Sequence, residues 1–207
     1  MAKAKSQEES VIIIPSIEIV EFQVRIIGES PLISHAWSKK AKQEMLDKQM
    51  GKAKKTKNFK NPWIDFCESL YWLTGMPEEP TEEDIQKASF GFPTTAFKEA
   101  AISGGYRSKV LKDKVSAYSA FHILGEFAVI EGIPQIREDM VRIANGSADI
   151  RYRGEFKEWS TVITIRHNKN ALSAEQIVNL FNLGGFGVGV GEWRIEKGGT
   201  FGSFKVA

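Results

Sequence analysis

The chain has 207 residues, of which 42% are hydrophobic and 26% are charged. This composition is close to average globular usage, so it excludes a fibrous chain and a largely disordered one. No stretch approaches the roughly 18 consecutive apolar residues of a membrane span, and the N-terminal MAKAKSQEES lacks the apolar centre of a secretory signal. We therefore expect a cytoplasmic protein with no membrane partner.

The single cysteine and the three histidines narrow the possible chemistry. Cys67 alone can form neither an internal disulfide nor a cysteine-based zinc site. His35, His122 and His167 lie far apart and show none of the short spacings of a metal-binding helix. We expect no metal and no cofactor.

Charge is distributed unevenly along the chain, although the formal net charge is only +2. Residues 37–60 hold nine lysines against two carboxylates, a net charge of +7. Residues 76–84 (MPEEPTEED) hold five carboxylates and two prolines, which predicts an exposed loop. The lysine-rich segment has two interpretations: a solvated face, or an electrostatic footprint for a polyanion.

The first predicted element follows a disordered tail over residues 1–10. In residues 17–27 (IEIVEFQVRII), every second residue from Val20 to Ile26 is apolar, which predicts a half-buried strand. From Ser38 the composition becomes helical, but apolar positions are sparse, so we expect an exposed helix. Residues 62–73 (PWIDFCESLYWL) open with a proline and carry apolar residues at helical spacing, which predicts a packed helix.

The centre of the chain predicts another helix followed by strands. The helix is expected to begin with Thr94 or Thr95 as its N-cap and to end at Gly104 and Gly105. Residues 150–156 (IRYRGEF) alternate apolar side chains with charged ones and predict a strand. Residues 159–166, rich in Thr, Val and Ile, predict its partner.

The C-terminal part begins with the clearest helix signal in the chain. Ser173 and Gln176 have the spacing of a capping box, and Gly184 is expected to end that helix. A glycine-rich passage then leads to a last strand at residues 201–206. The order of elements predicts an α+β protein with a ferredoxin-like or RRM-like core over residues 11–207, a helical, lysine-rich insertion at residues 35–90, and a C-terminal glycine-rich loop.

Residues 184–202 contain eight glycines. They do not form a phosphate loop of the nucleotide-hydrolase type, because no Gly-Lys-Ser/Thr follows them. They fit either a tight hairpin needed for packing or a surface where the backbone approaches a ligand. Trp193, Arg194 and Lys197 favour the second interpretation, because cations beside an aromatic ring suit phosphate and base.

Three segments resemble the RAMP superfamily, the RRM-like proteins of CRISPR effector complexes. GVGEWRIEKGGTFGSFKV and the helix before it look like the glycine-rich loop and final strand of that superfamily. SPLI at 30–33 resembles the turn after its opening strand, and FPTTAFKEA at 92–100 resembles its IPGSSLKGAL helix start, with Lys98 in the lysine's place. RYRGEFKEWSTVITIRHN is also similar to a group of phage-encoded proteins.

Two departures from the superfamily pattern bear on the expected activity. Glu99 replaces the usual glycine, and no arginine follows until Arg107. Nothing matches the loop aspartate with which some backbone subunits cut RNA, so that activity is not carried over.

The resemblance implies a backbone-type subunit that assembles as a homo-oligomer along single-stranded nucleic acid. We predict a non-enzymatic, phage-encoded protein of this kind that serves replication, recombination or annealing, with DNA and RNA both open as ligands. One alternative is an anti-defence module that sequesters a small nucleotide or a host complex. Another is a RAMP-type endoribonuclease that uses His35 as its general acid or base.

The residues expected to contact the strand are basic, aromatic or glycine. They are Lys39, Lys40, Lys52, Lys54, Lys55, Lys57, Lys98, Arg107, Arg151, Arg153, Gly187, Gly189, Gly191, Trp193, Arg194 and Lys197.

Overall fold

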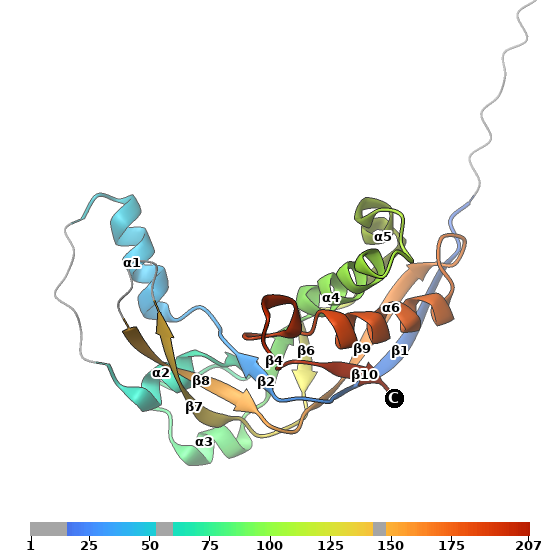
Figure 1. The fold of residues 1–207 in the computed structure, drawn as a ribbon. Coiled ribbons are helices and arrows are strands. Elements are labelled where there is room, and N and C mark those ends of the chain that lie inside the picture. The colour runs from blue at the N-terminus through green and yellow to red at the C-terminus, as the bar shows by residue number, and fades with distance from the viewer. Residues whose placement is uncertain (1–15, 53–59, 143–147) are drawn as a thin grey trace, which may run out of the picture.

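The computed structural model describes residues 16–52, 60–142 and 148–207. Its central element is an antiparallel four-stranded sheet in the order β10-β1-β9-β5. Its strands are β1 (Ile19–Gly28), β5 (Phe121–Ile123), β9 (Ser160–Asn168) and β10 (Phe204–Val206). Helices α4 (Thr94–Arg107) and α6 (Ala174–Gly187) lie along one face of this sheet (Figure 1).

The order of these six elements along the chain is β1, α4, β5, β9, α6, β10, which is the split βαβ arrangement of ferredoxin-like folds. The predicted α+β class and ferredoxin-like core are therefore confirmed. The predicted apolar alternation of the first strand is confirmed as well, because Val24 and Ile26 are buried opposite Ile163 and the other inward side chains of β9. Leu180 and Phe181 of α6 complete this core.

Glycines let α4 and α6 pack at backbone distance. A Cβ on Gly184 would lie 2.6 Å from the Ala100 backbone, and a Cβ on Gly104 would lie 2.5 Å from the Gly184 nitrogen. The expected helix ends at Gly104, Gly105 and Gly184 are therefore wrong, since α4 continues to Arg107 and α6 to Gly187. Gly104 and Gly184 lack the Cβ atoms that would prevent the two helices from packing this closely, and a rule based on local sequence cannot distinguish this role from helix capping.

Two insertions into the ferredoxin-like frame pair with each other. The first holds β2 (Leu32–Ser34), α1 (Lys39–Gln49), α2 (Pro62–Glu68), β3 (Tyr71–Trp72), α3 (Glu82–Lys87) and β4 (Phe90–Pro93). The second holds β6 (Phe127–Ile130), β7 (Gln135–Arg142) and β8 (Ala148–Phe156). They form two antiparallel sheets, β2-β8-β7 and β3-β4-β6, each with strands from both insertions.

Several predicted boundaries differ from those observed. The helix expected over residues 62–73 ends at Glu68, and strand β3 follows. The acidic segment expected to be a loop contains α3, which Thr81 and Asp84 begin with a capping box. Neither Thr94 nor Thr95 caps α4, because Pro93 is the N-cap residue and the Thr94 hydroxyl donates to the Gly125 carbonyl oxygen at 2.7 Å. The capping box at Ser173 is confirmed.

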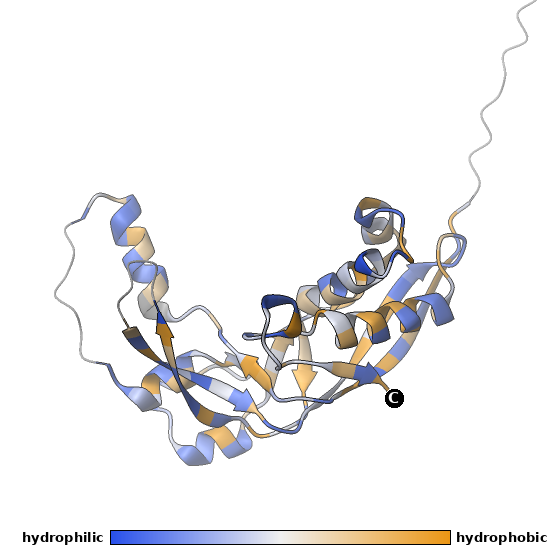
Figure 2. Cartoon of the chain, viewed as in Figure 1, coloured by the Kyte–Doolittle hydropathy of each residue, from blue (hydrophilic) through white to orange (hydrophobic). Residues whose placement is uncertain are grey.

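Helix α1 is an exposed arm. Ser38 caps it by accepting a hydrogen bond from the Ala41 amide at 3.1 Å, and its residues are largely solvent-exposed, including Met45 and Leu46. Figure 2 shows the helix as largely hydrophilic. In Figure 1, α1 and α5 (Lys114–Ala120) rise from opposite ends of the molecule toward the same side, so this side is concave. No helix in the described ranges has the length and apolar character to cross a bilayer.

Candidate nucleic-acid interface

A cleft of about 700 Å³ lies where the ferredoxin-like frame meets the insertions. His35, which follows β2, lines one wall. Lys98 and Glu99 of α4 and Tyr118 of α5 line the wall contributed by the frame. Gly191, Glu192 and Arg194 of the glycine-rich passage line the cleft as well. Its volume is within the range of small-ligand pockets.

Lys98 is the cation of the cleft that lacks an opposite charge. Its ammonium donates to the Tyr118 carbonyl oxygen at 2.8 Å and lies 3.4 Å from Nδ1 of His122. No carboxylate of the described residues forms an ion pair with it, although Glu99 is its neighbour in sequence. Burial lowers the pKa of Lys98 from its ordinary value, and burial followed by the Lys98 charge lowers the pKa of His122. The cleft thus contains a partly desolvated ammonium whose third donor is available.

Glu99 is already occupied by other partners. It accepts hydrogen bonds from Ser103 at 2.7 Å and from Lys114 at 3.0 Å, and a further one from the Tyr118 hydroxyl. Burial alone would raise the pKa of Glu99, but these hydrogen bonds lower it below its ordinary value. The same carboxylate raises the pKa of Tyr118 to about 12. Tyr118 therefore stays a neutral hydroxyl at the edge of the cleft.

His35 and Glu192 form a second polar pair in the cleft wall. Nδ1 of His35 lies 3.0 Å from Oε1 of Glu192, and this hydrogen bond lowers the pKa of Glu192 from its ordinary value. The contact fixes one ring nitrogen and leaves Nε2 for another partner. It joins the base of the α1 arm to the glycine-rich passage.

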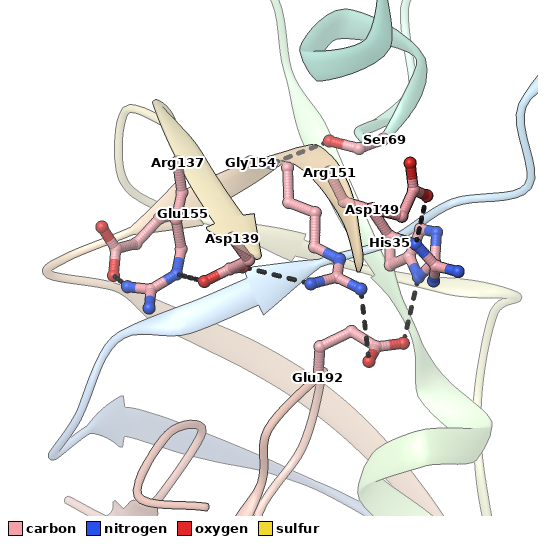
Figure 3. Close-up of polar contacts among 10 residues, drawn as sticks. His35, Ser69, Arg137, Asp139, Asp149, Arg151, Gly154, Glu155 and Glu192 are labelled. Carbon is pink, nitrogen blue, oxygen red and sulfur yellow. Dashed lines mark hydrogen bonds and ion pairs between the residues drawn. The ribbon is translucent and has the colours of Figure 1, made fainter. Parts of the chain in front are cut away.

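Behind Glu192, an ion-pair network extends into the β7 and β8 hairpin (Figure 3). Arg137 contacts Glu155 at 2.8 Å and Asp139 at 2.9 Å, and Asp139 accepts from Nη1 of Arg153 at 3.1 Å. Arg153 is only 2% exposed, and its Nη2 lies 4.0 Å from Oε2 of Glu192. The expected contact between Arg153 and a strand stays a prediction; in this structure the guanidinium is buried in the hairpin, behind the Glu192 side chain.

Arg194 and Arg107 share one carboxylate. Glu196 accepts from Arg194 at 2.9 Å and also pairs with Arg107. Two guanidinium groups around one carboxylate leave an excess positive charge beside the cleft. Trp193 is 43% exposed, and Lys197 is exposed on the short helix η1 (Ile195–Lys197).

The three predicted contact glycines have different roles. Gly189 is buried with φ +74°, and a Cβ there would lie 3.1 Å from the Gly202 carbonyl oxygen, so its packing inside the protein explains this glycine, and its role as a direct contact stays a prediction. Gly191 has φ +82° and lines the cleft, and a Cβ there would lie 2.6 Å from the Ile33 carbonyl oxygen. A Cβ on Gly187 would meet nothing within 4 Å outside its own helix. Gly189 and Gly191 therefore fit the interpretation that the passage is glycine-rich because its backbone packs closely against the rest of the protein.

The remaining predicted residues belong to α1 and the residues after it, to β8, or to a segment outside the described residues. Lys39 and Lys40 begin α1, Lys52 follows that helix and pairs with Asp47 at 3.3 Å, and Arg151 on β8 lies 3.6 Å from Asp149. Lys54, Lys55 and Lys57 lie outside the described residues.

The outer face of the four-stranded sheet has a different character from the cleft. Its arginines are paired: Arg25 with Glu131 at 2.6 Å and Arg166 with Glu21 at 2.6 Å. No Phe, Tyr or Trp points outward from β1 or β9, whose outward side chains include Gln23, Val162 and Thr164. This face therefore offers neither unpaired charge nor a stacking platform.

Sequence reasoning did not assign Glu99, Tyr118 or Glu192 to the site. They become neighbours only through the packing of α4, α5 and the glycine-rich passage around the cleft. Their local sequence has no motif that marks them. Among the described residues, no group of three or more His, Cys, Asp or Glu is placed to hold a metal ion.

Comparisons with known proteins do not assign this chain to a family. No family model matches the chain, and no curated protein matches it in sequence. One similar solved structure is the crystal structure of Cmr6 from Pyrococcus furiosus, with 9% identity over 93% of this chain and 100% of that chain, and a TM-score of 0.42. A likeness at that level carries no functional argument, so the ferredoxin-like assignment rests on the strand order.

Proposed function

We propose that this protein binds single-stranded nucleic acid on its concave side, with a backbone phosphate held at Lys98. The observation that carries the proposal is the ammonium of Lys98, which lines a cleft, is partly desolvated and has no carboxylate partner among the described residues. A desolvated cation without a counter-ion gains more from an anionic ligand than a solvated or paired one does.

The surroundings of Lys98 suit a polyanion with bases. Arg107 and Arg194 add excess positive charge on one side, while Tyr118 and Trp193 offer exposed ring surface. Base stacking on aromatic side chains and backbone contacts to cations are the two components of sequence-tolerant strand binding. The outer sheet face lacks both features, which supports the concave side as the interface.

The α1 arm extends the proposed interface. Lys42 and Lys48 are exposed on this helix, and neither has a carboxylate partner among the described residues. They belong to the stretch of residues 37–60 with its net charge of +7. In the proposal, the arm attracts the phosphate backbone without reading sequence, since such contacts act through counterion release.

The test is fluorescence anisotropy with labelled single-stranded RNA, single-stranded DNA and duplex. We expect both single strands to bind more tightly than the duplex, and Lys98→Gln to weaken strand binding about tenfold, which corresponds to about 1.4 kcal/mol. Lys169→Gln is the matched control, because it removes the same charge from a lysine that follows β9, pairs with Glu18 and does not line the cleft. Equal affinities for the two variants would overturn the proposal.

Assembly along the strand is the finer part of the proposal. We infer that several copies bind one strand as a homo-oligomer, as a backbone-type subunit does. Size-exclusion chromatography with light scattering, with and without a long single strand, measures the number of copies. A single copy bound per strand of any length would contradict this part.

A second candidate function, RNA cleavage, is favoured by the contact between His35 and Glu192. In that reaction Nε2 of His35 would take the proton of a ribose 2′-hydroxyl, the 2′-oxygen would attack phosphorus, and the bond from phosphorus to the 5′-oxygen would break as that oxygen takes a proton from water. We expect intact RNA after incubation with the protein, with or without magnesium. Specific cleavage that His35→Ala abolishes and Lys98→Gln does not would replace binding with catalysis as the function.

A salt titration separates strand binding from capture of a small nucleotide, the remaining alternative. Affinity for a strand falls steeply with salt because several phosphates release counterions. A small nucleotide bound in the cleft would show a shallow dependence. A shallow dependence together with tight binding of a mononucleotide would favour the capture function.

A further inference from the structure

Arg153 is a buried cation with too few hydrogen bonds. It is only 2% exposed, and its Nε has no hydrogen-bond partner among the residues that the structure describes. Nη1 bonds Asp139 at 3.1 Å, but Nη2 lies 4.0 Å from Glu192, which exceeds hydrogen-bond distance. A guanidinium has five donors, so this group retains capacity for an oxyanion.

Glu192 lies between this guanidinium and the cleft. One carboxylate oxygen accepts from His35 at 3.0 Å, and the other is the oxygen nearest to Arg153. The carboxylate lines the cleft, and its side chain is 43% exposed. It therefore presents two anionic oxygens to a histidine and an arginine, as one edge of a phosphate group would.

The backbone at Glu192 is fixed while the side chain has room to leave. The Glu192 amide donates to the Ile33 carbonyl oxygen at 3.1 Å, and Gly191 before it packs against the same carbonyl. Rotation of the Glu192 side chain into the cleft opening would uncover His35 and Arg153 without moving the loop. The His35 side chain is 37% exposed, so it is already within reach of a ligand.

We propose that Glu192 is an internal competitor, whose carboxylate occupies a phosphate subsite formed by His35 and Arg153 and is displaced by a phosphate group of the ligand. The subsite rests on the proposed function in sharing its cleft, but it is separate from Lys98. A phosphate there would satisfy donors of Arg153 that Glu192 leaves unbonded. Because the Glu192 carboxylate competes for the same donors, anions that bind weakly would not displace it from the subsite.

The test uses inorganic phosphate as the probe, titrated into the full chain and followed by isothermal titration calorimetry, with the ring signals of His35 in NMR locating the site in the variants that keep His35. We expect Glu192→Gln to bind phosphate about tenfold more tightly than the wild type, because the amide keeps the size of the side chain and removes the competing charge. Glu131→Gln is the matched control, since it removes one carboxylate charge on the outer sheet face. Equal phosphate affinity of the two variants would overturn the proposal.

Two double variants assign the gain to the subsite. Adding His35→Asn or Arg153→Lys to Glu192→Gln should abolish the tighter binding, with folding checked by circular dichroism. Because His35 is partly exposed, the first double variant should stay folded even where the second does not. A gain that persists in the His35→Asn double variant would contradict the subsite.

The outcomes also separate this inference from the proposed function. If Lys98→Gln weakens strand binding while Glu192→Gln gains no phosphate affinity, only the competitor role fails. If no strand binds but Glu192→Gln gains phosphate affinity, the competitor role stands and strand binding fails.

Discussion

The ferredoxin-like frame and the inserted half are stabilised in different ways. In the frame, α4 and α6 cross at backbone distance through Gly104 and Gly184 over an apolar sheet face. In the inserted half, a network of arginines and carboxylates joins the β7 and β8 hairpin to the glycine-rich passage, alongside its own aromatic core. Close packing of apolar side chains and backbone thus stabilises the frame, whereas ion pairs between arginines and carboxylates contribute to the inserted half.

The cleft lies where these two halves meet, and it takes one component from each. The frame supplies Lys98 on α4, which packs against α6 at backbone distance. The inserted half supplies His35, next to a network that already contains its own carboxylates. Basic residues of the same type therefore differ in whether they can bind an anionic ligand, because some already pair with a carboxylate of the protein and Lys98 does not.

The largest expected effect comes from breaking the frame. Gly184→Val would place its Cβ 2.6 Å from the Ala100 backbone, so α6 must move away from α4. We expect a loss of about 3 kcal/mol in the free energy of unfolding, measured by thermal or urea denaturation. Gly187→Val lies in the same helix with nothing within 4 Å, and it should stay within about 0.5 kcal/mol of the wild type. Equal losses in the free energy of unfolding for the two variants would show that an effect of valine within the helix itself, and not the contact between α4 and α6, causes the destabilisation.

Acid should weaken the inserted half before the frame. Hydrogen bonds from His35 and from Lys60 hold the pKa values of Glu192 and Asp149 below their ordinary values of 4.5 and 3.8. A carboxyl group with a lowered pKa in the folded state stabilises the fold above its unfolded pKa, and this contribution is lost as pH falls through the folded value. Native-state hydrogen exchange should therefore show β7 and β8 losing protection below about pH 4.5, ahead of β1 and β9. Simultaneous loss in all four strands would contradict the comparison.

The smallest effect is expected at Arg194, which is paired on the edge of the cleft. Arg194→Ala leaves Glu196 still paired with Arg107, so the free energy of unfolding should change by less than about 0.5 kcal/mol. Strand affinity should fall only about threefold, because the shared carboxylate already offsets part of the charge. A loss as large as that of Lys98→Gln would place the main phosphate contact at Arg194 instead.

The frame could be predicted from the sequence because its elements follow local rules. Alternation marked β1, and the capping box marked the start of α6 at Ser173. Gly184 misled the same reasoning, because a glycine beside another helix has the same local appearance as a helix cap.

The inserted half and the cleft depend on contacts that no local rule contains. Leu32 pairs with Phe156, so β2 and β8 meet across more than one hundred residues. Arg153 occupies a charged position of an alternating strand, which predicts exposure. It is buried instead, because Asp139 on the neighbouring strand β7 and Glu192 in the glycine-rich passage place carboxylates beside its guanidinium. Lys98 could be chosen from a resemblance, but its lack of a counter-ion required the structure.

The salt dependence of single-strand affinity in Lys98→Gln tests the central claim most directly. If Lys98 neutralises one phosphate, the slope of log K against log salt should become shallower by about 0.7 relative to the wild type. Lys169→Gln should leave the slope unchanged, because that lysine is paired with Glu18 and does not line the cleft. Wild-type slopes in both variants would contradict the claim that the unpaired ammonium of the cleft holds the strand.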